Sequence, residues 1–72
     1  KVGDIAATLS GSVVKVLVSQ GQKVKKGDDL VVTEAMKMET TITSPIDGTV
    51  GEIYVTKGQA IISGDCLLEV NE

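Results

Sequence analysis

The sequence predicts an all-β fold, a small sandwich or flattened barrel, from three observations. The β-branched residues Val, Ile and Thr make up 24 of the 72 residues, and branched side chains pack well on a pleated sheet. Eight glycines divide the chain into short apolar stretches of strand length. No stretch keeps the period of an amphipathic helix long enough to predict one.

An internal repeat predicts how the strands are arranged. Residues 48–70 align without a gap to residues 11–33 at an offset of 37, with 8 identities among 23 pairs. Each copy is too short to bury a core alone, so we expect the two halves to face each other with pseudo-twofold symmetry. Glycine recurs where a backbone needs positive φ or close approach. Positive φ or close approach is therefore expected at two matched pairs, Gly21/Gly58 and Gly27/Gly64.

Each half is predicted to contain strands separated by glycine turns. Pro45 lies in the link between the halves, where its missing N–H does no harm. The second half repeats the pattern of the first from Val50 to Val70. In the first half we expect a strand at Val13–Val18, a turn at Ser19–Gly21, a short strand at Val24, a turn at Lys26–Asp29 and a strand at Leu30–Thr33.

The residue types that are missing exclude several classes of function. Without His there is no Ser-His-Asp or Cys-His nucleophile and no imidazole ligand for a metal. Without Arg there is no bidentate clamp for phosphate or guanine, and the net charge of −3 repels nucleic acid. Cys66 stands alone, so neither an internal disulfide nor a thiolate zinc site can form. We therefore expect no metal site, no nucleic-acid partner and no catalytic residue of its own.

The segment between the halves, Glu34-Ala35-Met36-Lys37-Met38-Glu39-Thr40, breaks a local rule. A strand ending at Glu34 and another beginning at Glu39 leave a tight hairpin with Met36 and Lys37 near its tip. Such turns normally need Gly, Asn or Asp because their backbone has positive φ, and the segment has none of these. A rule broken at a symmetric, exposed position indicates a functional site. A lone amine on a rigid protrusion, between two methionines that are costly to leave in water, is suited to acylation by a separate enzyme.

These residues carry a resemblance to a known family. Ala35-Met36-Lys37-Met38 resembles the motif of biotinyl domains, the carrier domains of biotin-dependent carboxylases, and the likeness runs from about Ile5 to Glu69. The wider string from Thr33 to Thr41 is most similar to that of pyruvate carboxylases. The resemblance implies two four-stranded antiparallel sheets, biotin joined by an amide to the ε-nitrogen of Lys37, and recognition through the flanking Ala35, Met36 and Met38. The gap-free offset of 37 leaves no room for the extra "thumb" of the bacterial acetyl-CoA carboxylase carrier.

The same resemblance implies the partners and the chemistry. A biotin protein ligase attaches the cofactor, a biotin carboxylase domain uses ATP and bicarbonate to carboxylate the ureido nitrogen of biotin, and a carboxyltransferase domain passes the carboxyl group to pyruvate, giving oxaloacetate. Residues 1–72 then form a single biotinyl carrier domain of a larger multidomain enzyme, as the start at Lys1 rather than Met also suggests. With no signal peptide and no apolar run of membrane-spanning length, we expect a cytoplasmic, monomeric domain.

Other interpretations stay open at this point. The chain fits the carrier domain of another biotin-dependent carboxylase, decarboxylase or transcarboxylase. Lipoyl domains share the fold and modify a hairpin lysine, although their tip resembles Asp-Lys-Ala rather than Met-Lys-Met. A structural domain with unmodified Lys37 is a third possibility. An enzyme using Asp28 and Asp65 as a carboxylate pair is a fourth, although their matched Gly-Asp context more simply predicts turns.

Three smaller features complete the predictions. Lys23, Lys25 and Lys26 form a basic cluster, either a solvated face or a docking patch for an acidic partner surface. Cys66 lies among apolar residues and is expected to be a small core residue. Tyr54 matches Leu17 in the repeat and is expected to pack with its hydroxyl in water.

Overall fold

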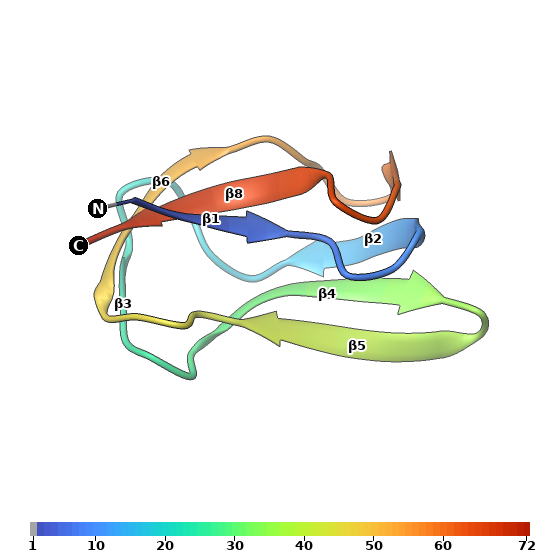
Figure 1. Cartoon of the computed structure of the whole chain (residues 1–72), viewed down its shortest axis with the longest axis horizontal. Coiled ribbons are helices and arrows are strands. Elements are labelled where there is room, and N and C mark those ends of the chain that lie inside the picture. The colour runs from blue at the N-terminus through green and yellow to red at the C-terminus, as the bar shows by residue number, and fades with distance from the viewer. Residues whose placement is uncertain (1) are drawn as a thin grey trace.

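The computed structural model describes residues 2–72, which form two four-stranded antiparallel sheets without any helix (Figure 1). One sheet has the strand order β1-β8-β6-β3 and the other the order β5-β4-β2-β7. The strands are β1 (Val2–Ala6), β2 (Gly11–Val16), β3 (Lys23–Val24), β4 (Asp29–Ala35), β5 (Met38–Thr43), β6 (Gly48–Ile53), β7 (Ala60–Ile61) and β8 (Cys66–Asn71). The all-β prediction is confirmed.

The two sheets are copies of each other under the 37-residue offset. Strands β5, β4, β2 and β7 of one sheet correspond to β1, β8, β6 and β3 of the other, in the same order. The register is also repeated: Val13 opposes Thr33 between β2 and β4, and Val50 opposes Val70 between β6 and β8. The predicted arrangement of two facing halves with pseudo-twofold symmetry is therefore confirmed.

The sequence did not predict the first strand, β1. Under the offset, β1 takes the place in its sheet that β5 takes in the other, and Ile5 opposes Leu68 as Ile42 opposes Val31. Only this isoleucine is shared between the two strands, since their other residues differ at every matched position. The sequence repeat is therefore weak here although the backbone repeat is complete.

The predicted glycine turns are confirmed by their backbone angles. Gly21 and Gly58 have φ of 89° and 86°, and Gly27 and Gly64 have φ of 93° and 96°. A residue with a Cβ adopts this left-handed region only at a cost, which explains why the glycines recur.

The matched aspartates Asp28 and Asp65 belong to the same turns. The Asp28 carboxylate accepts the backbone N–H of Lys25 at 2.9 Å, and the Asp65 carboxylate accepts the backbone N–H of Ile62 at 2.9 Å. Each side chain is thus engaged within its own turn, as the turn interpretation predicted.

The core lies between the sheets and is also symmetric. Leu30 and its counterpart Leu67 are both fully buried, and fully burying such a side chain stabilises the fold by about 1.5–3 kcal/mol. At one matched pair a polar residue replaces an apolar one, because Ser44 stands where the other half has Ala7. The Ser44 hydroxyl donates to the carbonyl oxygen of Ile46 at 2.6 Å, so it is satisfied. Other buried pairs are Val13/Val50, Val18/Val55, Val24/Ile61 and Val31/Leu68.

The strand boundaries differ from the prediction by up to two residues. β2 begins at Gly11 rather than Val13 and ends at Val16 rather than Val18. Its early start depends on pairing with β7, in which Gly11 opposes Ile61. This partner lies in the other half of the sequence, so local pattern could not reveal it. β4 continues past Thr33 to Ala35 because β5 stays paired with it up to that residue, where Ala35 opposes Met38.

Two smaller predictions need correction. Cys66, the first residue of β8, is only partly buried and is not a core residue. Its thiol contacts the Leu68 carbonyl oxygen at 3.6 Å. Burial still raises the pKa of the Cys66 thiol. Tyr54 is exposed rather than packed, and at the surface its hydroxyl donates to a Glu69 carboxylate oxygen at 2.5 Å. This hydrogen bond, with partial desolvation and the charges of Glu69 and Glu52, raises the pKa of Tyr54 to about 12.

None of the residues that the structure describes belongs to a helix long and apolar enough to cross a membrane.

Candidate functional site

The β4–β5 hairpin forms one end of the molecule's long axis and carries the predicted site (Figure 1). Its strands pair in antiparallel register up to Ala35 and Met38, which leaves a two-residue turn of Met36 and Lys37. The strands therefore approach the tip one residue closer on each side than predicted. Met36 has φ of 54° and Lys37 has φ of 68°, as in a type I′ hairpin turn.

The turn is strained because both of its residues carry a Cβ. A left-handed conformation costs such a residue about 1–2 kcal/mol. Among the residues described, Met36 and Lys37 are the non-glycine residues with positive φ. The paired strands β4 and β5 on either side determine this conformation by fixing the register up to the turn. The result is a lysine held at a defined position beyond the end of a sheet.

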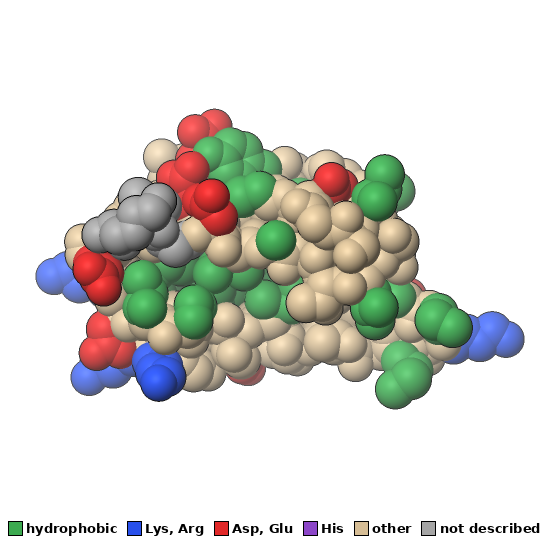
Figure 2. Space-filling model, in the orientation of Figure 1, with side chains coloured by type: hydrophobic (Ala, Val, Ile, Leu, Met, Phe, Trp, Pro, Cys, Tyr) green, Lys and Arg blue, Asp and Glu red, His purple; other side chains and the backbone are tan. Residues whose placement is uncertain are grey.

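The side chains of the turn project into solvent. Met36 is 89% exposed and Met38 is 70% exposed, and Lys37 is exposed as well, whereas Ala35 is half-buried. Figure 2 shows a basic side chain extending furthest at this end, beside hydrophobic side chains. The structure thus brings the four predicted residues together. A free amine here is accessible to a large reaction partner.

Gly11 supports the base of the hairpin, a role that the sequence analysis missed. A Cβ at Gly11 would overlap the Glu34 carbonyl oxygen and lie 3.0 Å from the Cβ of Ala35. The absence of a side chain at Gly11 and the small side chain of Ala35 therefore allow β2 to lie close beside the end of β4. The available signal was the identity of Gly11 with Gly48 in the repeat, since Gly48 makes the equivalent close approach to Asn71.

Two like charges lie beside the turn. Glu34 and Glu39 oppose each other directly across β4 and β5, and both are exposed. Such a like-charged cross-strand pair is destabilising. With Lys37 the hairpin end carries two negative charges and one positive charge, and acylation of the amine removes the positive one.

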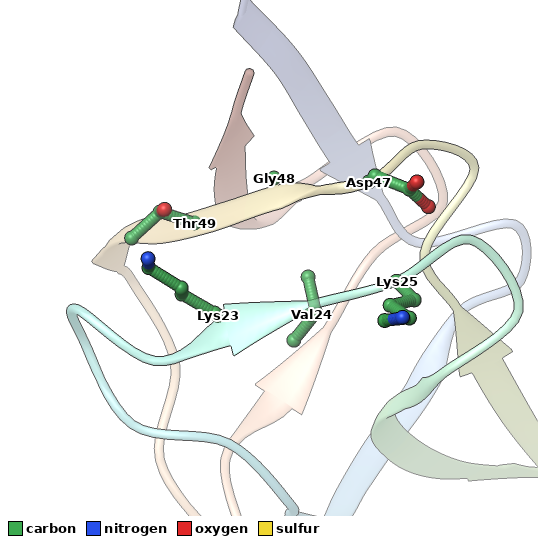
Figure 3. A pocket seen from close by; sticks show the side chains of 6 residues that line it. All are labelled: Lys23, Val24, Lys25, Asp47, Gly48 and Thr49. Carbon is green, nitrogen blue, oxygen red and sulfur yellow. The ribbon is translucent and has the colours of Figure 1, made fainter.

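A groove of about 340 Å³ lies between β3 and β6, away from the hairpin turn (Figure 3). Two lysines of the predicted basic cluster, Lys23 and Lys25, line it, and the backbone N–H of Lys26 donates to the Asp47 carboxylate at 2.7 Å. Within residues 2–72 no group of three or more His, Cys, Asp or Glu side chains is placed to hold a metal ion.

Comparison with known proteins connects this geometry to a family. The family model described as "Biotin-requiring enzyme", for biotin and lipoyl domains, matches residues 1–70. The pyruvate carboxylase of Bacillus subtilis is 50% identical over 68 residues, which is 94% of this chain and 6% of that protein. The chain therefore spans only a small part of the length of this relative.

Solved structures share the fold over nearly the whole chain. A single-chain, multi-domain long-chain acyl-CoA carboxylase matches with a TM-score of 0.89 and 37% identity, covering 94% of this chain and 7% of the other. The lipoyl domain of the 2-oxoglutarate dehydrogenase complex from Azotobacter vinelandii matches with a TM-score of 0.80 and 25% identity. That match covers 94% of this chain and 96% of the lipoyl domain.

Proposed function

The chain belongs to the biotin-requiring enzyme family of biotin and lipoyl carrier domains, and on this premise we propose that it carries biotin in amide linkage to the ε-nitrogen of Lys37. The domain then shuttles a carboxyl group from a biotin carboxylase domain to a carboxyltransferase domain, as a non-catalytic part of a larger biotin-dependent enzyme. The observation that carries this proposal is the exposed Lys37 in a strained two-residue turn at the end of a paired hairpin.

The chain's own residues supply attachment and position. Formation of the amide needs an amine that a ligase can reach, and Lys37 is exposed between two exposed methionines. The hairpin holds that amine beyond the sheet, so the group that it carries can enter a partner's active site. Biotin, when bound, supplies the ureido nitrogen that accepts and releases the carboxyl group. Tethering raises the effective concentration of that nitrogen at each partner site.

Identity with pyruvate carboxylases supports a more specific proposal about the acceptor. We propose that the parent enzyme carboxylates pyruvate to oxaloacetate, because the Bacillus subtilis pyruvate carboxylase is 50% identical over 94% of the chain. We also propose that residues 1–72 act as one carrier domain, that the isolated domain is a monomer, and that the parent enzyme works in the cytoplasm.

One experiment distinguishes biotin, lipoyl and unmodified states of Lys37. The purified domain is incubated with a biotin protein ligase, biotin and ATP, and in parallel with a lipoate ligase, lipoate and ATP, and its intact mass is measured. We expect the mass of one biotinyl group in the first reaction and unchanged mass in the second. Lys37→Arg, which keeps the charge, is the matched control and should stay unmodified. Lipoylation of the wild-type domain, or no modification by either ligase, would contradict the proposal.

A second experiment tests the acceptor. The biotinylated domain is added to separated biotin carboxylase and carboxyltransferase domains of the parent enzyme, with ATP, bicarbonate and, in parallel reactions, either pyruvate or an acyl-CoA. Oxaloacetate should form only when all three components are present. Transfer to an acyl-CoA but not to pyruvate would show a carrier with another acceptor.

A further inference from the structure

The repeat allows the two ends of the molecule to be compared residue by residue. At the Lys37 end, the loop before β2 carries Leu9 and the loop after β7 carries Ile62, which are 54% and 66% exposed. At the other end, Leu9 corresponds to Ile46, which packs against the core, and Ile62 corresponds to Lys25, which is exposed and charged. At the Lys37 end, exposed apolar side chains therefore stand where the other end has a partly buried isoleucine and a charged lysine.

The two loops are joined to each other and lie beside the hairpin. The backbone N–H of Ser63 donates to the Ser10 hydroxyl at 3.1 Å, and the Ser63 hydroxyl donates to the Thr8 carbonyl oxygen at 3.3 Å. Gly11, which follows Ser10, opposes Ile61 of β7 and lies against Glu34 and Ala35 at the base of the hairpin. The loops and the hairpin thus form one continuous end of the molecule (Figure 1).

We name this the tip surface and define it by its four exposed apolar residues, Leu9, Met36, Met38 and Ile62. Exposed apolar area is unfavourable in water, at about 25 cal/mol for each Å². The fold does not require an apolar residue at position 62, because Lys25 occupies the equivalent turn with the same hydrogen bond to an aspartate, at 2.9 Å in both halves. Several exposed apolar side chains at one end of the molecule, including one at position 62 that the fold does not require, indicate a contact surface. Among the described residues, the large exposed apolar side chains elsewhere are Leu17 and Tyr54.

We infer that Leu9 and Ile62 form a docking surface for the biotin protein ligase, in addition to the hairpin residues themselves. This inference rests on the proposed function. Before modification, only the Lys37 side chain can extend from the hairpin into a partner's active site. The ligase must therefore bring its active site to the ε-nitrogen. After modification the arm is longer by the whole biotinyl group, and a carboxylase domain can receive its end from further away. The partner that reacts with the bare amine is therefore the one that must approach the base of the hairpin most closely.

The charges on this end define the chemistry of the matching surface. Leu9, Ile62 and the serines of their loops carry no charge, whereas the equivalent loops at the other end contain Lys25, Lys26 and Asp47. An apolar ligase surface can cover Leu9 and Ile62 without desolvating an ion, which would be costly. Besides Lys37, charged side chains near these residues include Glu34 and Glu39 of the hairpin and the exposed Asp65, whose carboxylate accepts the backbone N–H of Ile62. These three carboxylates favour a basic rim on the ligase.

The test exchanges residues between the two ends. Ile62→Lys and Lys25→Ile each introduce the residue that the other half carries at the same place, so both are compatible with the local backbone. Biotinylation of each variant by a biotin protein ligase is followed over a range of domain concentrations. We expect Ile62→Lys to raise the KM for the domain about tenfold, with kcat nearly unchanged because Lys37 itself is intact. Lys25→Ile should leave both parameters as in the wild type.

A second set of variants separates lost contact from added charge. Leu9→Ser and Ile62→Ser remove apolar area without adding a charge and should each raise KM, while Leu17→Ser, away from this end, should not. Equal KM for wild type, Ile62→Lys and Leu9→Ser would overturn the inference while leaving Lys37 as the modification site. Slower carboxyl transfer with normal biotinylation would likewise overturn it, because the surface would then serve a carboxylase domain. Self-association of the domain through Leu9 and Ile62, with unchanged KM, would assign the surface to a second copy instead. Failure of the wild-type domain to be biotinylated is a separate result, which would overturn the proposed function.

Discussion

The two ends of this molecule have the same backbone and different chemistry. At one end, β4 and β5 pair with Glu34 opposite Glu39 and are joined by Met36 and Lys37. At the other, the equivalent strands β8 and β1 pair with Asn71 opposite Val2 in the same register and are not joined by a turn. The symmetric fold therefore provides two equivalent pairs of strand ends, and at one of them a two-residue turn joins the strands and presents Lys37. The backbone that the two ends share stabilises the fold, whereas the Met36–Lys37 turn, which only one end has, is the basis of the proposed carrier function.

The largest expected effect is a loss of unfolding free energy when a side chain is added where two strands lie close together, at either end of the molecule. Gly11→Ala and Gly48→Ala each place a Cβ against a backbone carbonyl oxygen, that of Glu34 or of Asn71. Because a backbone atom cannot give way easily, we expect each variant to lose about 2 kcal/mol or more of unfolding free energy. Chemical denaturation measures both losses.

The two glycine variants should differ in modification. Gly11 supports the hairpin that carries Lys37, whereas Gly48 supports the opposite end. Under conditions where both variants remain folded, Gly11→Ala should slow biotinylation and Gly48→Ala should not. Equal rates for the two variants would show that the base of the hairpin does not position Lys37.

The next effect tests whether the two halves are equivalent in their turns. Gly27 and Gly64 have φ of 93° and 96°, and there is open space around the position of a Cβ in each. Val at either position should therefore cost about 1–2 kcal/mol from backbone strain alone, equally in both halves. Thermal or chemical unfolding of Gly27→Val and Gly64→Val checks this. A loss at one position only would break the symmetry on which the comparison of the ends depends.

A smaller effect is expected at the methionines of the turn. Met36 and Met38 are so exposed that truncation to Ala should lower the unfolding free energy by less than about 1 kcal/mol. A buried Met or Leu truncated in the same way loses about 2–5 kcal/mol, and Leu67→Ala provides that reference in this domain. The methionine variants should instead change the kinetics of biotinylation or carboxyl transfer. Large unfolding losses with normal kinetics would make these methionines structural residues.

The smallest effect concerns a side chain that only one half possesses. Tyr54 stands where the other half has Leu17, and its hydrogen bond to Glu69 raises its pKa from 10.0 to about 12. Because the folded-state pKa is the higher one, the stabilising contribution is complete below pH 10 and is lost as the pH rises through about 12. Tyr54 is the chain's one aromatic residue, so near-ultraviolet absorbance reports its ionisation directly.

The matched variant for that titration is Glu69→Val, which introduces the residue found at the equivalent position, Val32. It removes both the acceptor and the charge, so Tyr54 should then ionise closer to pH 10. Identical titration curves for the two proteins would show that Glu69 does not hold the hydroxyl.

Most of the fold could be predicted because the information was local or repeated. β-branched strands and matched glycines predict the turns at Gly21 and Gly64, and the repeat predicts two facing halves. The first strand escaped because its pairing with β8 joins residues at opposite ends of the chain. Strand ends such as Gly11 and Ala35 were misplaced for the same reason, since partner strands rather than local sequence decide them.

The candidate site could be predicted in its residues but not in its surroundings. Met36 and Lys37 were identified because they occupy a tight turn without Gly, Asn or Asp, and their positive φ explains why this matters. Leu9 and Ile62 were not identified, because each is an ordinary loop residue in sequence. Only the fold places them beside the hairpin and shows that the counterpart of Leu9 is partly buried and packed against the core.

The central claim is that one end of a symmetric domain, and one lysine on it, receives biotin. Its most direct test is site-resolved mass spectrometry of the wild-type domain after incubation with a biotin protein ligase, biotin and ATP. Besides Lys37, the chain has six lysines, with a cluster at Lys23, Lys25 and Lys26 and others at Lys1, Lys15 and Lys57. We predict one biotinyl group per chain, on Lys37, with the other lysines unmodified. Biotin on Lys15, Lys57 or the cluster, at a rate comparable with Lys37, would contradict the claim.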